Sequence, residues 1–330
     1  MNAVVHEGDC REVMRGMEPG SVHCCVTSPP YWGLRDYGHE GQLGLEETVE
    51  AYVATMVGVF REVRRLLRDD GTLWLNLGDS YAGSWAGNLM RPGGGSQREG
   101  GPGFQPLDDR VPERSGAVPD GLKPKDLVGV PWRVAFALQA DGWYLRQDII
   151  WHKPNPMPES VRDRCTKAHE YVFLLSKSER YYYDADAIKE PSVDPAGSAK
   201  RYQTPFTGAA GNVVCPGDPE GQRYRPSGMR EFAGNRNKRS VWNVTLRPFG
   251  GAHFAVFPPA LIEPCVLAGC PEDGTVLDPF AGSGTTGIVA RHHGRRFVGA
   301  ELNPEYAAMA RDRIAREAPP TLFDAEGGAA

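Results

Sequence analysis

Residues 275–290, TVLDPFAGSGTTGIVA, place a glycine-rich loop between a predicted strand and a predicted helix. Gly282, Gly284 and Gly287 fit the pattern G-x-G-x-x-G, in which glycine permits a tight turn and lets the backbone approach a ligand. Glu301 ends the next predicted strand, 19 positions after Gly282. A carboxylate there can accept hydrogen bonds from both hydroxyls of a ribose, so the segment predicts a site for an adenosine-containing cofactor.

The glycine pattern alone leaves two other interpretations open. One is a close-packed turn without a ligand, and the other is an NAD site of an oxidoreductase. Asp278 precedes the loop, where its carboxylate would repel a pyrophosphate but could accept hydrogen bonds from a cationic amino-acid group. The loop also lies near the C-terminus, so half of the sheet would have to come from the N-terminal part of the chain.

The rest of the chain alternates between strand and helix patterns. Strands are predicted at 4–9, 21–28, 71–79, 143–153, 170–178, 274–282 and 295–302. Helices are predicted at 48–71, 131–142, 258–270, 285–294 and 304–316, and the first carries a long apolar stripe. This alternation predicts an α/β fold with a mainly parallel, doubly wound sheet that helices cover on both faces.

Composition excludes several classes of protein. The sequence of 330 residues has no apolar run of about 18 residues, so we expect no membrane helix. The N-terminus lacks a basic segment followed by an apolar one, which indicates a cytoplasmic protein. Seven cysteines, an odd number, occur without C-x-x-C spacing, so we expect neither a disulfide framework nor a metal site.

Two irregular segments interrupt the pattern. Residues 82–122 are rich in glycine and proline, and residues 190–240 are similar but more basic. The net charge of −5 does not itself indicate a nucleic-acid binder, yet residues 196–247 hold nine basic and three acidic side chains. Such a segment is either a solvated loop or a surface for a phosphate backbone.

The stretch CCVTSPPYW, residues 24–32, ends an apolar run with a hydroxyl residue, two prolines and two aromatics. Prolines restrict their own φ and the conformation of the preceding residue, so the turn after Ser28 is rigid. A proline turn over a pair of core aromatics is the structural interpretation of this stretch.

TSPPYW and DPFAGSGT together resemble the DNA amino-methyltransferases, which use S-adenosylmethionine to methylate exocyclic amines. The catalytic motif precedes the cofactor motif, which resembles the circularly permuted β-class order. The resemblance extends over most of the chain through GDC at 8–10, IIWHKPNPMPES at 149–160, HEYVFLLSKS at 169–178, FPPALIEPCV at 257–266 and ELNPEY at 301–306.

The resemblance implies a Rossmann-like methyltransferase sheet of seven strands, one of them antiparallel. It implies a catalytic half from residues 1–81 and 123–189 and a cofactor-binding half from residues 241–330. The Gly/Pro-rich insertion 82–122 and the basic region 190–240 are then candidate target-recognition segments, and arginines in the second would suit guanine edges.

The resemblance also implies roles for named residues. Ser28 Oγ and the Pro29 carbonyl would accept hydrogen bonds from the exocyclic amine, Pro30 would hold the turn, and Tyr31 would stack on a flipped base. The expected cofactor-binding residues are Asp9, Cys10, Phe257, Pro258, Asp278, Phe280, Ala281, Gly282, Ser283, Gly284, Glu301, Leu302 and Asn303. The expected DNA-binding residues are Trp32, Lys153, Asn155, Arg223, Arg225, Arg236, Lys238 and Arg239.

Some of these assignments have structural alternatives. Trp32 either lines the pocket or packs under the loop, and Lys153 and Asn155 either touch DNA or belong to a surface loop. Pro264-Cys265 matches the nucleophile dipeptide of cytosine-C5 methyltransferases, but it lies in a predicted apolar helix. We therefore expect a buried structural cysteine and no covalent intermediate.

The resulting hypothesis is a site-specific DNA methyltransferase that acts on double-stranded DNA and produces N4-methylcytosine. Serine before Pro-Pro-Tyr resembles the cytosine-N4 enzymes, and its hydroxyl could also donate to cytosine N3. Adenine-N6 methylation is the alternative, and an NAD-dependent oxidoreductase or a non-catalytic DNA-binding module are more distant ones. The resemblance admits a cognate restriction endonuclease as a partner, and the sequence leaves the oligomeric state open.

Overall fold

The computed structural model describes residues 3–34, 38–39, 41–83, 118–194, 234–246 and 257–317. The chain divides into two units. The first comprises Met1–Asp184 and Ser240–Ala330, and the second comprises Ala185–Arg239.

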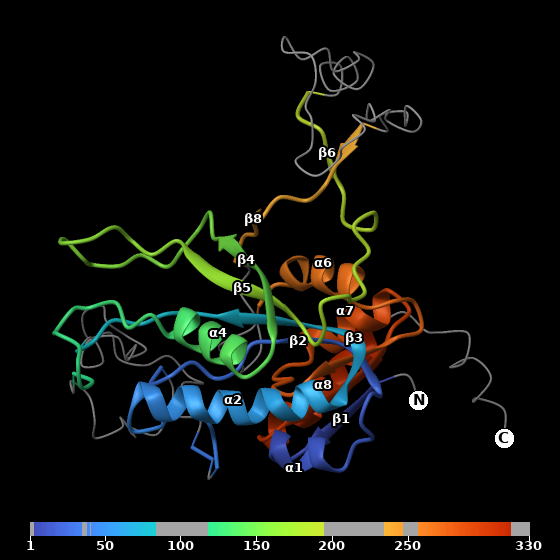
Figure 1. Cartoon of the computed structure of the whole chain (residues 1–330), viewed down its shortest axis with the longest axis horizontal. Coiled ribbons are helices and arrows are strands. Elements are labelled where there is room, and N and C mark those ends of the chain that lie inside the picture. Colours follow the sequence, from blue (N-terminus) through green and yellow to red (C-terminus); the bar gives the residue numbers. More distant parts are fainter. Residues whose placement is uncertain are drawn as a thin grey trace, which may run out of the picture. The chain divides into compact units, whose positions relative to one another are not determined.

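An eight-stranded sheet, in the order β1-β10-β9-β2-β3-β5-β4-β8, forms the centre of the first unit (Figure 1). Its strands are β1 (Ala3–Glu7), β2 (Val22–Thr27), β3 (Leu67–Leu77), β4 (Tyr144–His152), β5 (His169–Ser176), β8 (Val241–Asn243), β9 (Thr275–Asp278) and β10 (Arg296–Glu301). All neighbours are parallel except that β5 runs antiparallel to both β3 and β4. The mostly parallel sheet confirms the predicted fold class.

The eighth strand is a difference from the seven that the resemblance implied. β8 pairs with β4, matching Val241 to Ile150, and so lies at the edge of the sheet opposite β1. The indole of Trp151 fixes the chain beyond β8 by donating to the carbonyl of Val244 at 2.9 Å. The expected boundary placed residues 241–243 in the cofactor-binding half. In the structure they pair instead with β4, at the opposite edge of the sheet from β1.

Helices cover both faces of the sheet. On one face lie α1 (Cys10–Arg15), α2 (Val49–Leu66) and α4 (Val130–Ala140), with α2 in contact with both others. On the other face α7 (Thr285–His292) contacts both α6 (Pro259–Gly269) and α8 (Pro304–Glu317). Figure 1 shows α2 and α4 running side by side across one face. Because helices cover both faces, the sheet is doubly wound, as predicted.

The apolar stripe of α2 builds the core on its face of the sheet. Its fully buried side chains are Val49, Tyr52, Met56, Val59, Phe60, Val63 and Leu66. Thr48 caps the helix by accepting a hydrogen bond from the backbone of Ala51 at 3.1 Å. Each buried aliphatic or aromatic side chain contributes roughly 1.5–3 kcal/mol of hydrophobic stabilisation, so this single helix anchors the sheet strongly.

A strand near the N-terminus pairs within the sheet with a strand from the C-terminal part of the chain. β1 pairs in parallel with β10, and the register brings Glu7 opposite Glu301. Beyond the paired residues, Gly8 donates to the carbonyl of Glu301 at 2.9 Å. The predicted permuted arrangement, in which an N-terminal strand completes the C-terminal cofactor half, is confirmed.

Of the Gly/Pro-rich insertion, residues 84–117 lie outside the described residues. The chain on either side of it is joined by hydrogen bonds of 2.8 Å from Ala82 N to the Asp126 carbonyl and from Lys125 N to the Ala82 carbonyl. The insertion therefore begins and ends next to the end of β3.

In the second unit, β6 (Glu190–Pro191) and β7 (Asn235–Arg236) form a two-stranded antiparallel sheet. Arg236 and Arg239 both donate to Glu190 Oε1, at 2.8 and 2.6 Å. Arg223 and Arg225 lie outside the described residues. No described helix is long and apolar enough to cross a membrane.

Candidate active site

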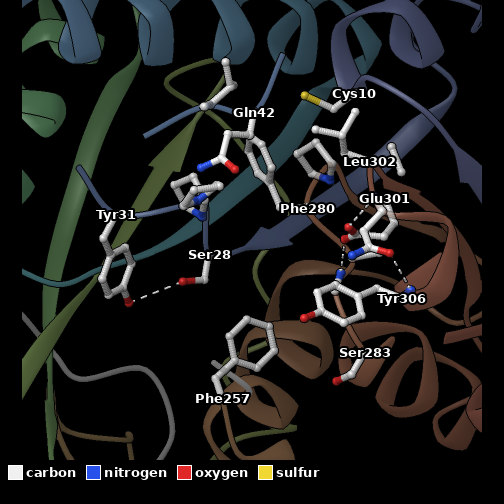
Figure 2. A pocket seen from close by; sticks show the side chains of 18 of the residues that line it. Cys10, Ser28, Tyr31, Gln42, Phe257, Phe280, Ser283, Glu301, Leu302 and Tyr306 are labelled. Atoms are coloured by element: carbon white, nitrogen blue, oxygen red, sulfur yellow. Dashed lines mark hydrogen bonds between the residues drawn. The ribbon is translucent and has the colours of Figure 1, made fainter. Parts of the chain in front are cut away.

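A cavity of about 330 Å³ opens at the carboxyl ends of the parallel strands, where ligands bind in open α/β sheets. Figure 2 shows Ser28, Tyr31 and Gln42 on one side of this cavity and Cys10, Glu301, Leu302 and Tyr306 on the other, with Phe280 between them in the view. The cavity thus joins the proline–aromatic turn that follows β2 to the glycine loop that follows β9.

The glycine loop has the geometry that its sequence predicts. Gly282 and Gly284 have φ values of 51° and 82°, in the left-handed region that favours glycine. A Cβ on Gly284 would lie 3.0 Å from the Cβ of Ala310 in α8. Glycine is therefore needed there both for the turn and for the packing of α8 against it.

Glu301 is anchored on both sides at the end of β10. Its carboxylate accepts from the backbone of Gly282 at 2.8 Å and from the backbone of Asn303 at 2.9 Å (Figure 2). Burial raises the pKa of this carboxyl. Because each oxygen of a carboxylate accepts more than one hydrogen bond, the side chain can still receive ligand hydroxyls from the cavity.

Asp9 reaches the same cavity from the end of β1. It caps α1, and its Oδ1 accepts from the backbone of Arg11 at 2.8 Å. The hydrogen bond from the Arg11 guanidinium lowers the pKa of Asp9. Asp9 and Glu301 line one pocket, as the permuted arrangement predicts.

Asp278 requires a correction. Its side chain is 1% exposed and does not line the cavity. Its two oxygens accept at 2.6 Å from the hydroxyls of Thr27 in β2 and Thr286 in α7. Burial raises the pKa of Asp278 to about 6. Asp278 therefore ties the strand, loop and helix together beneath the site, and the expected contact with a cationic cofactor group is not supported.

Most of the other predicted cofactor-binding residues line the cavity, and two of them cap helices next to it. Cys10, Phe257, Phe280, Ala281, Gly282, Ser283, Leu302 and Asn303 line the cavity. Gly284 and Pro258 do not line it and instead precede α7 and α6 as their N-cap residues. Burial raises the pKa of the Cys10 thiol to about 12, so this side chain is a neutral part of the wall.

Ser28, Pro29, Pro30 and Tyr31 all line the cavity. The carbonyl of Pro30 accepts from Tyr52 in α2 at 2.9 Å, which holds the turn against the core. The Tyr31 ring packs against Gly78, where a Cβ would lie 2.5 Å from Tyr31 Cε2. Burial, and to a lesser extent Glu170, raise the pKa of Tyr31 well above its usual value.

Lys153 has a different environment from the one predicted. It lines the cavity, forms an ion pair with Glu170, and lies 4.3 Å from the centre of the Trp151 ring. Asn155 exchanges hydrogen bonds with the backbone of Leu246, at 3.0 Å as donor and 2.9 Å as acceptor. Both side chains thus have partners within the chain, Lys153 at the cavity and Asn155 in the segment that follows β8.

Trp32 is a core residue, contrary to its place among the expected DNA-binding residues. It is 4% exposed, and its indole donates to the carbonyl of Glu46 at 3.0 Å. Cys265 is also buried, as predicted, and its thiol contacts the Leu261 carbonyl within α6. In the second unit, Arg236 and Arg239 are paired with Glu190, and Lys238 also has a partner.

Several residues of the cavity wall were not predicted. Among them are Gly8, Gln42, Asn76, Glu170, Thr285 and Tyr306. Glu170 and Tyr306 fall inside the motifs HEYVFLLSKS and ELNPEY. Their positions near the start of a strand and of a helix could have indicated that they line the cavity. Gln42 lies 11 positions after Tyr31, and no motif or periodic pattern in the sequence identifies it. No group of three potential metal ligands occurs in the described part of the chain.

Comparison with known proteins identifies the family. The model of the DNA methylase family that comprises N6- and N4-methyltransferases matches residues 22–312. The Type II methyltransferase M.SmaI of Serratia marcescens is 48% identical over 313 residues, covering 94% of this chain and 89% of its own. M.Cfr9I of Citrobacter freundii, also a Type II methyltransferase, is 46% identical over 319 residues, covering 96% and 88%.

Solved structures share the fold. A protein described as a DNA modification methylase of Thermus thermophilus, solved in complex with S-adenosyl-L-methionine, gives a TM-score of 0.57 at 25% identity, covering 96% of this chain and 95% of its own. The cytosine-N4-specific PvuII DNA methyltransferase gives 0.59 at 19% identity, covering 95% and 86%. The chain belongs to the family of N6- and N4-methylating DNA methylases.

Proposed function

We propose that this chain is a Type II DNA methyltransferase that transfers a methyl group from S-adenosylmethionine to the N4 amine of a cytosine in double-stranded DNA. The observation that carries this proposal is the shared cavity. Ser28 of the Ser-Pro-Pro-Tyr turn and Glu301 of the glycine-loop unit line one space, so an amine and a methyl donor can be brought together there. The Type II relatives support DNA methyltransferase activity, without indicating which base is methylated.

The cofactor side of the cavity fits an adenosine-containing molecule. Its volume of about 330 Å³ lies in the range of small-molecule sites. Glu301 would receive ribose hydroxyls, the Gly282 backbone allows close approach, and the Phe280 ring supplies an apolar wall. S-adenosylmethionine, when bound, supplies a methyl group already activated on a sulfonium, so the chain has mainly to position the acceptor.

The substrate side would hold an extruded base. Extrusion costs a few kcal/mol, and stacking on an aromatic side chain returns roughly 1–3 kcal/mol. Tyr31 is fixed for such stacking, because its ring packs on Gly78 and its hydroxyl donates to Glu170 at 2.8 Å. Ser28 Oγ and the Pro29 carbonyl are the acceptors that would draw the amine towards the methyl group.

The choice of cytosine over adenine rests on the Ser-Pro-Pro-Tyr sequence. Donation from Ser28 to cytosine N3 is not supported, because the Ser28 hydroxyl donates to Tyr31 at 3.3 Å. Adenine-N6 methylation is therefore the alternative to exclude by experiment. We also propose that the second unit, Ala185–Arg239, contributes to target recognition and that a cognate restriction endonuclease accompanies the enzyme.

Transfer of labelled methyl from S-adenosylmethionine to double-stranded DNA tests the activity. The proposal expects label in the DNA with the wild-type chain and none with Ser28→Ala/Tyr31→Ala. NAD-dependent oxidoreduction without methyl transfer, or DNA binding without either reaction, would contradict it.

A further inference from the structure

Four polar side chains from separate parts of the chain meet at the substrate side of the cavity. Tyr31 comes from the turn after β2, Asn76 from β3, Lys153 from the end of β4, and Glu170 from β5. The side chains of Lys153 and Glu170 are only 15% and 16% exposed, and they form an ion pair. Removing a charged pair from water to this degree costs desolvation free energy, which indicates a role beyond that of a surface ion pair.

The hydrogen-bond directions in this cluster are determined by its carboxylate. Glu170, paired with the Lys153 ammonium, can only accept hydrogen bonds. Asn76 Nδ2 faces two acceptors, Glu170 Oε2 at 3.2 Å and the Tyr171 carbonyl at 3.1 Å, so it must be the amide nitrogen. Asn76 Oδ1 is then also an acceptor.

Tyr31 has one hydroxyl proton and faces both acceptors. Its oxygen lies 2.8 Å from Glu170 Oε2 and 3.2 Å from Asn76 Oδ1, so its proton points to this pair. In the contact with Ser28, at 3.3 Å, the Tyr31 oxygen must therefore accept and Ser28 must donate. Both lone pairs of Ser28 Oγ are consequently left for other donors in the cavity.

We propose that Glu170 is a positioning residue for methyl transfer, which orients Ser28 as an acceptor through Tyr31 and receives the proton that the amine loses. The proposal rests on the proposed function only in requiring an exocyclic amine, and it holds for cytosine or adenine.

The proton movement balances. The nitrogen lone pair forms the bond to the methyl carbon while the electrons of the carbon–sulfur bond return to sulfur, and nitrogen then carries one surplus proton. That proton passes to Ser28 Oγ, the Ser28 proton passes to the Tyr31 oxygen, and the Tyr31 proton passes to Glu170. The hydroxyls are re-formed, and the net change is one proton from the amine to the Glu170 carboxylate.

Two lysine side chains, Lys153 and Lys167, lie close to Glu170. Besides Lys153, the ammonium of Lys167 is near Glu170 and has no hydrogen-bond partner among the described residues, and burial lowers the pKa of Lys167. Burial, and next the charge of Lys167, lower the pKa of His169. The raised pKa of Tyr31 keeps that residue a neutral carrier, so Glu170 is the terminal acceptor.

The test compares Glu170→Gln, Tyr31→Phe and the double variant in single-turnover methylation. Each single change is expected to slow transfer by about 10²-fold, the usual contribution of a positioned proton acceptor, with unchanged affinity for cofactor and DNA. Because Glu170 acts through Tyr31, the double variant is expected to be no slower than Tyr31→Phe. Glu50→Gln, which removes an exposed ion pair with Arg133, is the matched control and should react at the wild-type rate.

A second readout needs no reaction. In the apo chain with labelled tyrosine, the hydrogen-bonded Tyr31 hydroxyl proton should give an NMR resonance that Tyr31→Phe removes and Glu170→Gln shifts. Multiplicative rate losses in the double variant, wild-type turnover in Glu170→Gln, or an unshifted resonance would overturn the proposal. Identification of the methylated nucleoside from the wild-type reaction tests the cytosine assignment separately, so the two can fail independently.

Discussion

The carboxylate of Glu301 at the end of β10 accepts a hydrogen bond of 2.8 Å from the backbone of Gly282, across the loop that leaves the neighbouring strand β9. This bond joins the acidic residue and the glycine turn into one rigid unit. β1 continues the sheet on the other side of β10, so Asp9 reaches the same cavity from the opposite end of the chain. The cavity therefore brings together residues almost 300 positions apart in the sequence.

Glu301→Ala should weaken S-adenosylmethionine binding by about 1.5–3 kcal/mol, the contribution of hydrogen bonds to a charged group. The substitution also removes the acceptor for Gly282 and Asn303, so the loop should loosen. Calorimetry on the purified chain measures the affinities for S-adenosylmethionine and for NAD. S-adenosylmethionine should bind the wild type and NAD should not; saturable NAD binding without a response to S-adenosylmethionine would contradict the assignment.

Tyr31→Ala should keep cofactor affinity and lose most methylation, because Tyr31 lies on the substrate side of the cavity. Turnover at the wild-type rate would make Tyr31 a packing residue only. The rate of methyl transfer and the cofactor dissociation constant, measured on the same preparation, check both halves of this prediction.

Gly78→Ala should disturb the same tyrosine without changing it, since the new Cβ would lie 2.5 Å from Tyr31 Cε2. Overpacking of this kind costs about 1–3 kcal/mol of folding free energy, and methylation should fall as the ring is displaced. Gly58→Ala in α2 is the matched control, because none of the described residues outside its own helix backbone comes within 4 Å of the added Cβ. That variant should keep full activity and gain about 0.4–1 kcal/mol in unfolding free energy.

Asp278 should impose a pH dependence on stability. Its pKa is raised from 3.8 to about 6 in the folded protein, so the native state binds more protons than the unfolded chain between these values. Stability from this residue is therefore largest below about pH 4 and falls by about 3 kcal/mol as the pH rises through 6. Urea unfolding of wild type and Asp278→Asn across this range measures the difference, and a constant difference would refute the prediction.

The sequence predicted those parts of the fold whose pattern is long enough to be periodic. The α2 stripe and the order of strands and helices were correct, because burial of one face imposes a regular apolar spacing. The three residues of β8 and the six of α1 are too short to show a period. β8 is recognised only through its pairing with β4, a contact between segments about 90 residues apart.

For the candidate site, the sequence predicted the location of the two motifs but not the direction of every side chain. The glycine loop and the Ser-Pro-Pro-Tyr turn carry backbone requirements in their residue types, so both could be located and both line the cavity. The direction of a single side chain could not be predicted. Asp278 precedes the loop in sequence but turns towards Thr27 and Thr286, and Trp32 follows Tyr31 but turns into the core.

Mass spectrometry of nucleosides from DNA methylated by the purified wild-type enzyme tests the central claim most directly. The account predicts N4-methylcytosine, and no N6-methyladenine, in double-stranded DNA incubated with S-adenosylmethionine. N6-methyladenine without N4-methylcytosine would contradict the cytosine assignment, and the absence of any methylated base would contradict the proposed function itself.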